Sequence, residues 1–300
     1  MQMAKYLKSM VILGALSGYG YSTPAAAETV NCTNITSVPT VITTQGVYCL
    51  KQHVSAALAS GAAITVNTNN VTIDCNEFKV GNLAAGPGTN AVGILATARQ
   101  NVNVRNCGIR GYRTGIQMLD GSYRVEDNVL DFNTQTAIHV SGAGSAIRGN
   151  EIVDTGNTGL PGVTTFHGIF GEGDVDVIDN LIDGVVASGG SNGTAYGIRT
   201  DDMNGGTVKG NRVRNLARDG TGARRGIWNE SGVRNTFEAN TVVMDAGGLL
   251  GADAGIRCGG SSLILNGALR DNTILGTGVL GEVFGLINCT SIQGNFVNPL

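Results

Sequence analysis

Val125-Glu126-Asp127-Asn128-Val129-Leu130 decides the fold, because its spacing returns along most of the chain. The motif is an apolar residue, two variable positions, Asn, one variable position and a second apolar residue. Successive copies start 21 to 32 residues apart, and internal repetition at this period is typical of solenoid proteins. The Asn position is filled in turn by Asn76, Cys107, Asn128, Asn150, Asn180, Asn211, Asn240, Asn272 and Asn295.

A second motif, a small residue followed by Ile, precedes most copies of the first. Apolar and polar residues alternate around both motifs, which is the pattern of β-strands, and no repeat holds a long run with helical spacing. Each repeat therefore reads as strand, turn, strand, Asn turn, strand and loop. The second motif occurs at Gly93-Ile94, Gly115-Ile116, Ala137-Ile138, Gly168-Ile169, Gly197-Ile198, Gly226-Ile227 and Gly255-Ile256.

This pattern predicts an all-β protein, a single-domain parallel β-helix of about nine coils. Each coil would bury its Ile and Val on the coils above and below, about 4.8 Å away. The recurrent Asn would accept a left-handed backbone at the turn and bond to its copies in a ladder. A leucine-rich repeat is the competing fold, but the chain is rich in Ile, Val and Gly rather than Leu.

The stretches Val71-Thr72-Ile73-Asp74-Cys75-Asn76 and Val104-Arg105-Asn106-Cys107-Gly108-Ile109 resemble the right-handed parallel β-helix repeat family. The resemblance covers about residues 64–297. That superfamily includes pectate-lyase-like enzymes, polygalacturonases and many uncharacterised exported proteins. The resemblance implies the fold, whereas activity depends on the site that a particular chain carries.

Residues 1–27 have the features of a secretory signal peptide, with two lysines, an apolar stretch too short to span a bilayer and a small-residue end. Residues 28–63 lack the repeat and are predicted to be an N-terminal cap segment, and residues 64–300 form the β-helix domain. The sequence thus predicts a secreted or periplasmic protein without a transmembrane segment. Whether Lys51 to Ser60 form a short helix or an irregular strand is left open.

The net charge and the cysteines limit the kinds of partner and the compartment that the sequence allows. Loss of the two lysines in residues 1–27 would take the net charge from −3 to −5, so nucleic acid is not an expected partner. Exported chains form disulfides, and a Cys32–Cys49 bridge is favoured. Cys258 and Cys289 can bridge neighbouring repeats, whereas Cys75 and Cys107 are out of register and are interpreted as small buried residues.

Loops of twelve to fifteen residues, 153–167, 183–196, 214–225 and 243–254, follow two short ones. Long loops on consecutive coils would wall one side of the small-Ile strand, as similar loops do in enzymes of this superfamily. The alternative is neutral insertion, because closure entropy grows slowly with loop length.

With Ile pointing inward, the residues two and four positions after the small residue point outward. The first outward row is Leu95, Gln117, His139, Phe170, Arg199, Trp228 and Arg257. The second is Thr97, Leu119, Ser141, Glu172, Asp201, Glu230 and Gly259.

Three carboxylates, Glu172, Asp201 and Glu230, therefore fall on successive coils, with Asp202 nearby. Like charges so close need compensation. Arg199 and Arg257 can pair with them in a structural ladder. Alternatively, Glu172, Asp201 and Asp202 can bind Ca²⁺, or one carboxyl can stay protonated as the acid of glycoside cleavage.

Trp228, the only Trp, is predicted to stack on a sugar ring or on a cation, unless it packs under loop 214–225. Phe170 and His139 lie on the same outward row and join it as candidate substrate-binding residues. His167 is predicted inward or at the strand entrance. Its neighbourhood, Phe166-His167-Gly168, differs from the Gly-His-Gly of polygalacturonases and precedes the Asp pair instead of following it.

Two functions follow. The favoured one is an exported carbohydrate-active protein that cleaves an acidic polysaccharide as a lyase or hydrolase. Its catalytic residues would be Glu172, Asp201, Glu230, Arg199 and Arg257, with Asp202 assisting substrate binding. The alternative is a non-catalytic polysaccharide-binding or structural protein. An uncovered last coil near Leu300 would also allow assembly with another subunit.

Overall fold

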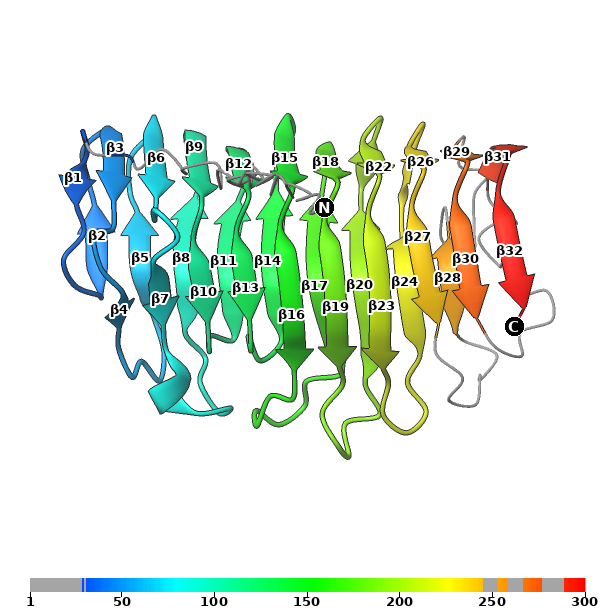
Figure 1. Cartoon of the computed structure of the whole chain (residues 1–300), viewed down its shortest axis with the longest axis horizontal. Helices are drawn as coiled ribbons and strands as arrows, with labels where there is room; N and C mark the ends of the chain where they lie inside the picture. Colours follow the sequence, from blue (N-terminus) through cyan, green and yellow to red (C-terminus); the bar gives the residue numbers. More distant parts are fainter. Residues whose placement is uncertain (1–28, 30, 245–252, 258–266, 277–288, 300) are drawn as a thin grey trace, which may run out of the picture.

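The computed structural model describes residues 29, 31–244, 253–257, 267–276 and 289–299. In this part of the chain, three long parallel sheets wind around one core and form a solenoid (Figure 1). Consecutive strands along the chain belong to different sheets, and each strand pairs with its counterpart one coil away. Of the predictions above, the signal peptide and Gly259 lie outside the described residues.

Two of the sheets flank the Asn turn of each repeat. The first has eleven described strands, namely β1 (Thr33–Asn34), β3 (Gly46–Cys49), β6 (Val71–Asp74), β9 (Gln100–Arg105), β12 (Ser122–Glu126), β15 (Ser145–Arg148), β18 (Val175–Ile178), β22 (Thr207–Lys209), β26 (Thr236–Glu238), β29 (Gly267–Arg270) and β31 (Cys289–Gln293). The second has ten, namely β4 (Val54–Ser55), β7 (Lys79–Gly81), β10 (Gly108–Arg110), β13 (Val129–Asp131), β16 (Glu151–Gly156), β19 (Leu181–Val186), β23 (Arg212–Ala217), β27 (Thr241–Met244), β30 (Thr273–Gly276) and β32 (Phe296–Pro299).

The third sheet contains the small-Ile motif. Its nine described strands are β2 (Thr40–Ile42), β5 (Ala62–Val66), β8 (Val92–Thr97), β11 (Thr114–Leu119), β14 (Thr136–Ser141), β17 (Thr165–Glu172), β20 (Thr194–Asp201), β24 (Arg224–Asn229) and β28 (Ala254–Arg257). A short extra pair, β21 (Met203–Asn204) with β25 (Gly232–Val233), and one 3₁₀ turn, η1 (Leu83–Ala85), complete the described elements.

The predicted stacking of the small-Ile motifs from coil to coil is confirmed. Ile138, Ile169 and Ile198 pair in one ladder of the nine-stranded sheet and are fully buried. Each coil contributes to three parallel sheets, and the only helical element among the described residues is the short η1, so the fold is the predicted β-helix and not a leucine-rich repeat. The number of coils differs slightly from the predicted nine, and the three sheets hold eleven, ten and nine described strands.

The Asn ladder runs along the core edge as predicted. The Asn128 amide nitrogen donates to the Asn150 amide oxygen at 2.9 Å, and Asn150 donates in the same way to Asn180 at 2.9 Å. The chain of bonds continues through Asn211, Asn240 and Asn272 to Asn295. Each of these amides also bonds to backbone, which satisfies buried groups at every turn.

The left-handed residue of the turn is not the Asn, which corrects the prediction. It is the residue before it, as in Asp127 (φ 54°), Gly149 (φ 65°) and Asp179 (φ 54°). The Asn side chain is therefore selected for its hydrogen bonds, and the preceding position selects residues that accept a positive φ. Asn76 is an exception and is itself left-handed (φ 48°).

The segment predicted to cap the solenoid carries short strands of its own. β2 pairs with β5, β3 with β6 and β4 with β7, so these residues continue the three sheets. The open question over Lys51 to Ser60 is resolved in favour of an irregular strand, β4. In the first repeat, Val80 rather than Phe78 pairs with Ile109 inside the core, because this turn is two residues longer.

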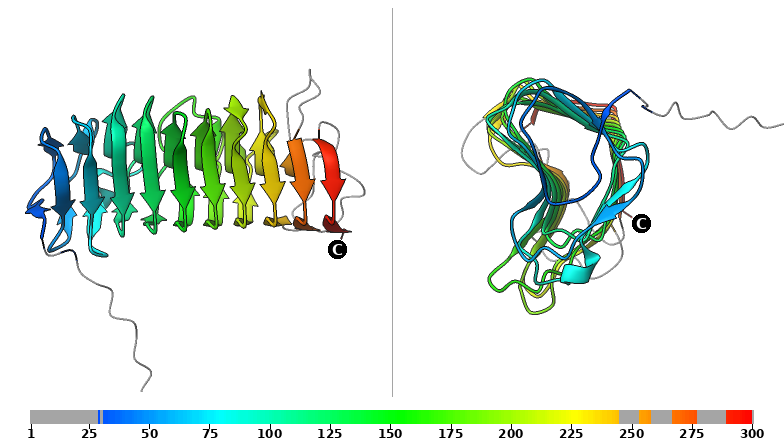
Figure 2. Two further views of the ribbon diagram at one scale, coloured as in Figure 1. Left: turned by 90° about the horizontal axis from the view of Figure 1, so that it is seen from above. Right: turned by 90° about the vertical axis from the view of Figure 1, so that its left-hand side faces the viewer.

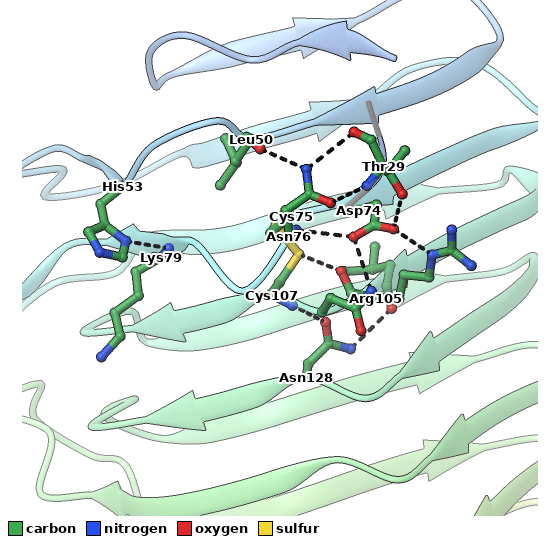
Figure 3. The surroundings of a disulfide bond; sticks show 12 residues. Thr29, Leu50, His53, Asp74, Cys75, Asn76, Lys79, Arg105, Cys107 and Asn128 are labelled. Carbon is green, nitrogen blue, oxygen red and sulfur yellow. Dashed lines mark hydrogen bonds and ion pairs between the residues drawn. A yellow bond between two sulfur atoms is a disulfide. The ribbon is translucent and has the colours of Figure 1, made fainter. Parts of the chain in front are cut away.

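Two disulfides are present among the described residues. The predicted Cys32–Cys49 bridge is confirmed. Cys75 and Cys107 also form a disulfide, which links two neighbouring coils and corrects their interpretation as unpaired residues (Figure 3). The longer first turn brings the two sulfur atoms together even though the cysteines occupy different positions of their repeats. Cys258 of the third predicted pair lies outside the described residues.

Among the described residues, no helix has the length and apolar character needed to cross a membrane.

Candidate functional site

The strands of the nine-stranded sheet bend at the small-Ile motif. His167 and Phe170 are three residues apart, yet their rings stack with centroids 5.2 Å apart on the outer side. In a straight strand, residues three apart would point to opposite faces. Gly168 and Ile169 between them both face inward, and a Cβ on Gly168 would lie 2.7 Å from Cγ2 of Ile182 in the opposite sheet. The small residue is therefore required where the strand bends towards the core.

The bend repeats from coil to coil and brings two outer rows together. Figure 2 shows, in the end-on view, a cross-section that is indented on one side. The predicted first row is in register, and a second row, one residue before each small residue, converges on it. We call the combined surface the stacked face, made of His139, His167, Phe170, Tyr196, Arg199, Arg225, Trp228 and Arg257.

Aromatic rings alternate with guanidinium groups along the stacked face. The ring of Phe170 has His139 at 4.6 Å and the Arg199 guanidinium carbon at 4.7 Å from its centroid. Tyr196 has His167 at 5.1 Å and Arg225 at 5.2 Å. Cation–π contacts of this kind stabilise a charge in a partly dry setting.

Trp228 continues the series and lies between two arginines. The guanidinium carbons of Arg225 and Arg257 lie 3.6 Å and 4.2 Å from its ring centroid. Only 7% of Trp228 is exposed, so its ring is a cation–π partner, one of the two roles that the sequence predicted for it. Sugar stacking on this ring would require an arginine to move.

The three predicted carboxylates lie at the same end of neighbouring strands, because Glu172 and Asp201 end β17 and β20 and Glu230 follows β24, but each has a partner. The Glu172 carboxylate contacts His139 Nε2 at 2.6 Å. Glu230 accepts a 2.7 Å hydrogen bond from Arg199 Nε, and Asp201 lies 3.8 Å from the same guanidinium. Arg199 therefore bridges two coils, as the structural-ladder alternative predicted, while Glu230 and Glu172 keep one side open to solvent.

Of the two positions predicted for His167, the inward one is wrong, because its ring stacks near the start of β17 on Phe170 and Tyr196. It is nonetheless buried, under Phe170 and Tyr196. Burial lowers the pKa of His167 to about 3, and the nearby charges of Arg199 and His139 act in the same direction. The imidazole is therefore neutral at neutral pH and serves as a flat polar ring in the stack.

Three nitrogen atoms in the stacked face have no hydrogen-bond partner among the described residues. They are His167 Nε2, Arg225 Nε and Trp228 Nε1. Burial also lowers the pKa of Arg225, whose Nη1 donates to the Tyr196 hydroxyl at 2.7 Å. Unpaired buried polar groups are rare in proteins, and these three atoms are covered by the stacked face rather than open to solvent.

The proposed calcium ligands are held by local hydrogen bonds. The Ser231 hydroxyl donates to Asp201 at 2.6 Å and contacts Asp202 at 2.7 Å, and Asp202 has a positive φ of 48° at the turn. Within the described ranges, no group of three His, Cys, Asp or Glu side chains is arranged to hold a metal ion. Calcium binding at Glu172, Asp201 and Asp202 stays a prediction.

The long loops begin later than predicted, because β16, β19 and β23 extend into them. Their remaining parts lead into β17, β20 and β24 and project along one edge of the solenoid (Figure 1); they are residues 157–164, 187–193 and 218–223. A cavity of about 390 Å³ lies between the first two, lined by Thr158 to Thr164 and Ser188 to Ser191. Most of loop 243–254 lies outside the described residues.

Sequence reasoning missed the second outer row, Tyr196 and Arg225 above all. Alternation in a straight strand placed these side chains inward. The signal was present, since a small residue before each Ile allows two successive residues to face the core.

With this geometry in hand, the class is clear: residues 92–296 match the family described as right handed beta helix region. The match spans more than half of the chain, and the chain belongs to that family. In a comparison with curated proteins, no sequence matches this chain.

Two solved structures are similar in fold. One is the A-module of the mannuronan C-5 epimerase AlgE6 of Azotobacter vinelandii, at 14% identity, covering 85% of this chain and 81% of that one, with a TM-score of 0.38. The other is the Dettilon tailspike protein (gp208), at 13% identity, covering 87% of this chain and 60% of that one, with a TM-score of 0.31. Likeness at this level says nothing about activity.

Proposed function

We propose that this chain is an exported carbohydrate-active protein that binds an acidic polysaccharide along the stacked face. The carrying observation is the row of partly exposed guanidinium groups of Arg199, Arg225 and Arg257, which lie between aromatic rings on one face. Carboxylate and hydroxyl oxygens of a uronate chain are acceptors for such donors, and hydrogen bonds from a guanidinium to a carboxylate are the stronger ones. Two disulfides support export, because disulfides persist in oxidising compartments.

Cleavage of the bound chain is the second candidate. The observation that favours it is the His139–Glu172 pair, with 2.6 Å between Nε2 and Oε2 and one side open to solvent. A His–carboxylate pair within hydrogen-bond reach can move a proton to or from a substrate. Asp201, Glu230, Arg199 and Arg257 complete the predicted set, although Arg199 is tied to carboxylates and is better suited to holding a uronate than to acting as a base.

Binding can be tested by isothermal titration of the purified protein with uronate polysaccharides, polygalacturonate and alginate among them. We expect saturable binding that an Arg225→Gln variant weakens at least roughly tenfold, equivalent to about 1.4 kcal/mol. Arg124→Gln is the charge-matched control, because Arg124 is exposed on β12 in a different sheet. Equal affinity of both variants would remove the stacked face as the binding surface.

Turnover is tested separately with the same polysaccharides, with and without EDTA. New reducing ends or unsaturated uronates would establish cleavage, and loss of product in EDTA would support the calcium prediction. A Glu172→Gln variant should then bind with little change but lose turnover. Binding without any product would leave the protein as a non-catalytic binder.

A further inference from the structure

A second pocket lies above the short turns that follow β10 and β13, where two longer segments, residues 82–90 and the loop after β16, meet. Residues 82–90, which include η1, reach across the turns after β10 and β13 towards the loop after β16 (Figure 1). Gly159 N donates to the Pro87 carbonyl at 2.8 Å, and the Thr158 hydroxyl donates to the same oxygen at 3.3 Å. The pocket associated with this bridge has a volume of about 350 Å³, within the size range of small-ligand sites.

The base of this bridge is fixed by buried amides. The Asn82 side chain accepts from Leu58 N at 2.6 Å and donates to Leu58 O at 3.1 Å. Asn133 accepts from Tyr112 N at 3.2 Å and donates to Ile109 O at 3.0 Å. The pocket is therefore formed by well-bonded backbone, which favours a preorganised site.

One lining residue has an unexpected backbone conformation. The residue that follows the third strand position of each coil is left-handed, with φ from 49° to 92°; in coil order these residues are Gly111, Phe132, Asp154, Gly184 and Asn215. Gly, Asp and Asn accept this conformation, whereas a bulky aromatic residue rarely does. Phe132 is also 49% exposed, so burial does not explain its presence. Strain retained at one surface position points to a role in binding.

The polar groups of the pocket complement this ring. Asp154 lies on the next coil, about 5 Å away along the solenoid, and lines the same pocket. Thr134 is 7% exposed, and its hydroxyl has no hydrogen-bond partner among the described residues. Arg110, whose guanidinium carbon lies 5.5 Å from the Phe132 ring centroid, is paired with Asp131 at 2.8 Å.

We infer that this pocket binds a neutral pyranose sugar residue. The apolar face of the ring would pack on Phe132 and Leu83, while neighbouring hydroxyls donate to the exposed Asp154 carboxylate. The carboxylate repels uronates and phosphates, so a neutral sugar is the ligand class. This site is separate from the stacked face and does not depend on the function proposed for it.

The test is a titration, followed by protein NMR, with methyl glycosides of glucose, mannose, galactose and galacturonate. We expect saturable binding of at least one neutral glycoside, with the galacturonoside at least roughly tenfold weaker. Failure of every neutral glycoside to bind, or equal binding of the galacturonoside, would overturn the inference. Phenol binding as tightly as the glycosides would do the same, because it would make the site a simple apolar pocket.

Variants connect binding to this pocket. Phe132→Asn and Asp154→Asn should each weaken glycoside binding at least roughly tenfold. Neither should lower the thermal midpoint, because Asn accepts the left-handed conformation and already occupies position 215. Asn215→Gly, at the same coil position outside the pocket, is the control and should bind as the wild type does. Wild-type affinity in either pocket variant would contradict the assignment.

Discussion

Arg225 and Trp228 lie three residues apart in one strand, and the guanidinium carbon of Arg225 is 3.6 Å from the centroid of the Trp228 ring. This contact requires both side chains to leave the strand on the same side, so the strand must bend between them. Arg199 and Tyr196 repeat the relationship one coil earlier, at 5.6 Å. The bend is thus a property of the repeat, and it creates the two-row face on which the proposed function depends.

The bend leaves no room for a side chain at Gly168, although Ala137 fills the equivalent position one coil earlier. A Cβ at Gly168 would lie 2.6 Å from the Gly197 carbonyl oxygen and 2.7 Å from Cγ2 of Ile182. We expect Gly168→Ala to lower the free energy of unfolding by about 1–3 kcal/mol through overpacking. Urea denaturation measures the change. Gly189→Ala is the control, because no atom lies within 4 Å of its added Cβ, and a loss as large as that of Gly168→Ala would refute the packing explanation.

The Asn ladder should carry a large share of the stability. Asn180 accepts from the Asn150 backbone and side chain, both at 2.9 Å, and donates to Ile147 O at 3.0 Å. Asn180→Ala would leave these buried groups unpaired, at a cost of about 1–3 kcal/mol for each. Chemical denaturation of this variant and of Asn204→Ala, a substitution at an exposed Asn, gives the comparison. Equal stability of the two variants would show that the ladder is dispensable.

The Cys75–Cys107 disulfide should stabilise the first coils. It closes a loop of 32 residues between two neighbouring coils. The chain-entropy relation gives roughly 3–4 kcal/mol for a loop of this length. Unfolding of the Cys75→Ala/Cys107→Ala double variant under non-reducing conditions measures the contribution. If thiol titration of the unfolded wild type finds Cys75 and Cys107 reduced, the bridge is absent and the prediction is wrong.

His167 should make stability depend on pH. Its pKa falls to about 3 in the folded protein from 6.5, mainly through burial. Between these values the unfolded chain binds a proton that the folded chain does not. The free energy of unfolding should therefore fall as the pH drops below about 6.5, by up to about 1.4 kcal/mol per pH unit. Above that pH, His167 is neutral in both states and does not change the stability.

The check is urea denaturation of wild type and His167→Gln at several pH values between 4 and 7. In His167→Gln, the free energy of unfolding should depend less steeply on pH. His53→Gln, a substitution at an exposed His, should keep the pH dependence of the wild type. A wild-type slope in His167→Gln would mean that other groups cause the acid sensitivity.

Periodicity predicted the parts of this protein that repeat. The inward Ile, the Asn ladder and the outward rank of Phe170, Arg199 and Trp228 follow from strand alternation and coil stacking, and the structure places them accordingly. Alternation failed where the strand bends, so Tyr196 and Arg225 were missed and an inward position was one of the two predicted for His167.

Departures from the repeat were the other source of error. The Cys75–Cys107 bridge depends on a turn two residues longer than its neighbours, which a fixed motif does not register. The pocket at Phe132 depends on residues 82–90 reaching the loop at Gly159, a contact between segments about 70 residues apart. A Phe in a column otherwise filled by Gly, Asp and Asn was the available signal, and it becomes visible only when the coils are aligned.

The stacked face can be tested most directly through Trp228, because it is the only Trp in the chain. Its intrinsic fluorescence should be recorded while the protein is titrated with uronate oligosaccharides. We expect a saturable change in emission that Arg225→Gln weakens and Arg124→Gln does not. Binding seen by calorimetry with no change in Trp228 emission would contradict it, and so would the absence of binding to every acidic glycan.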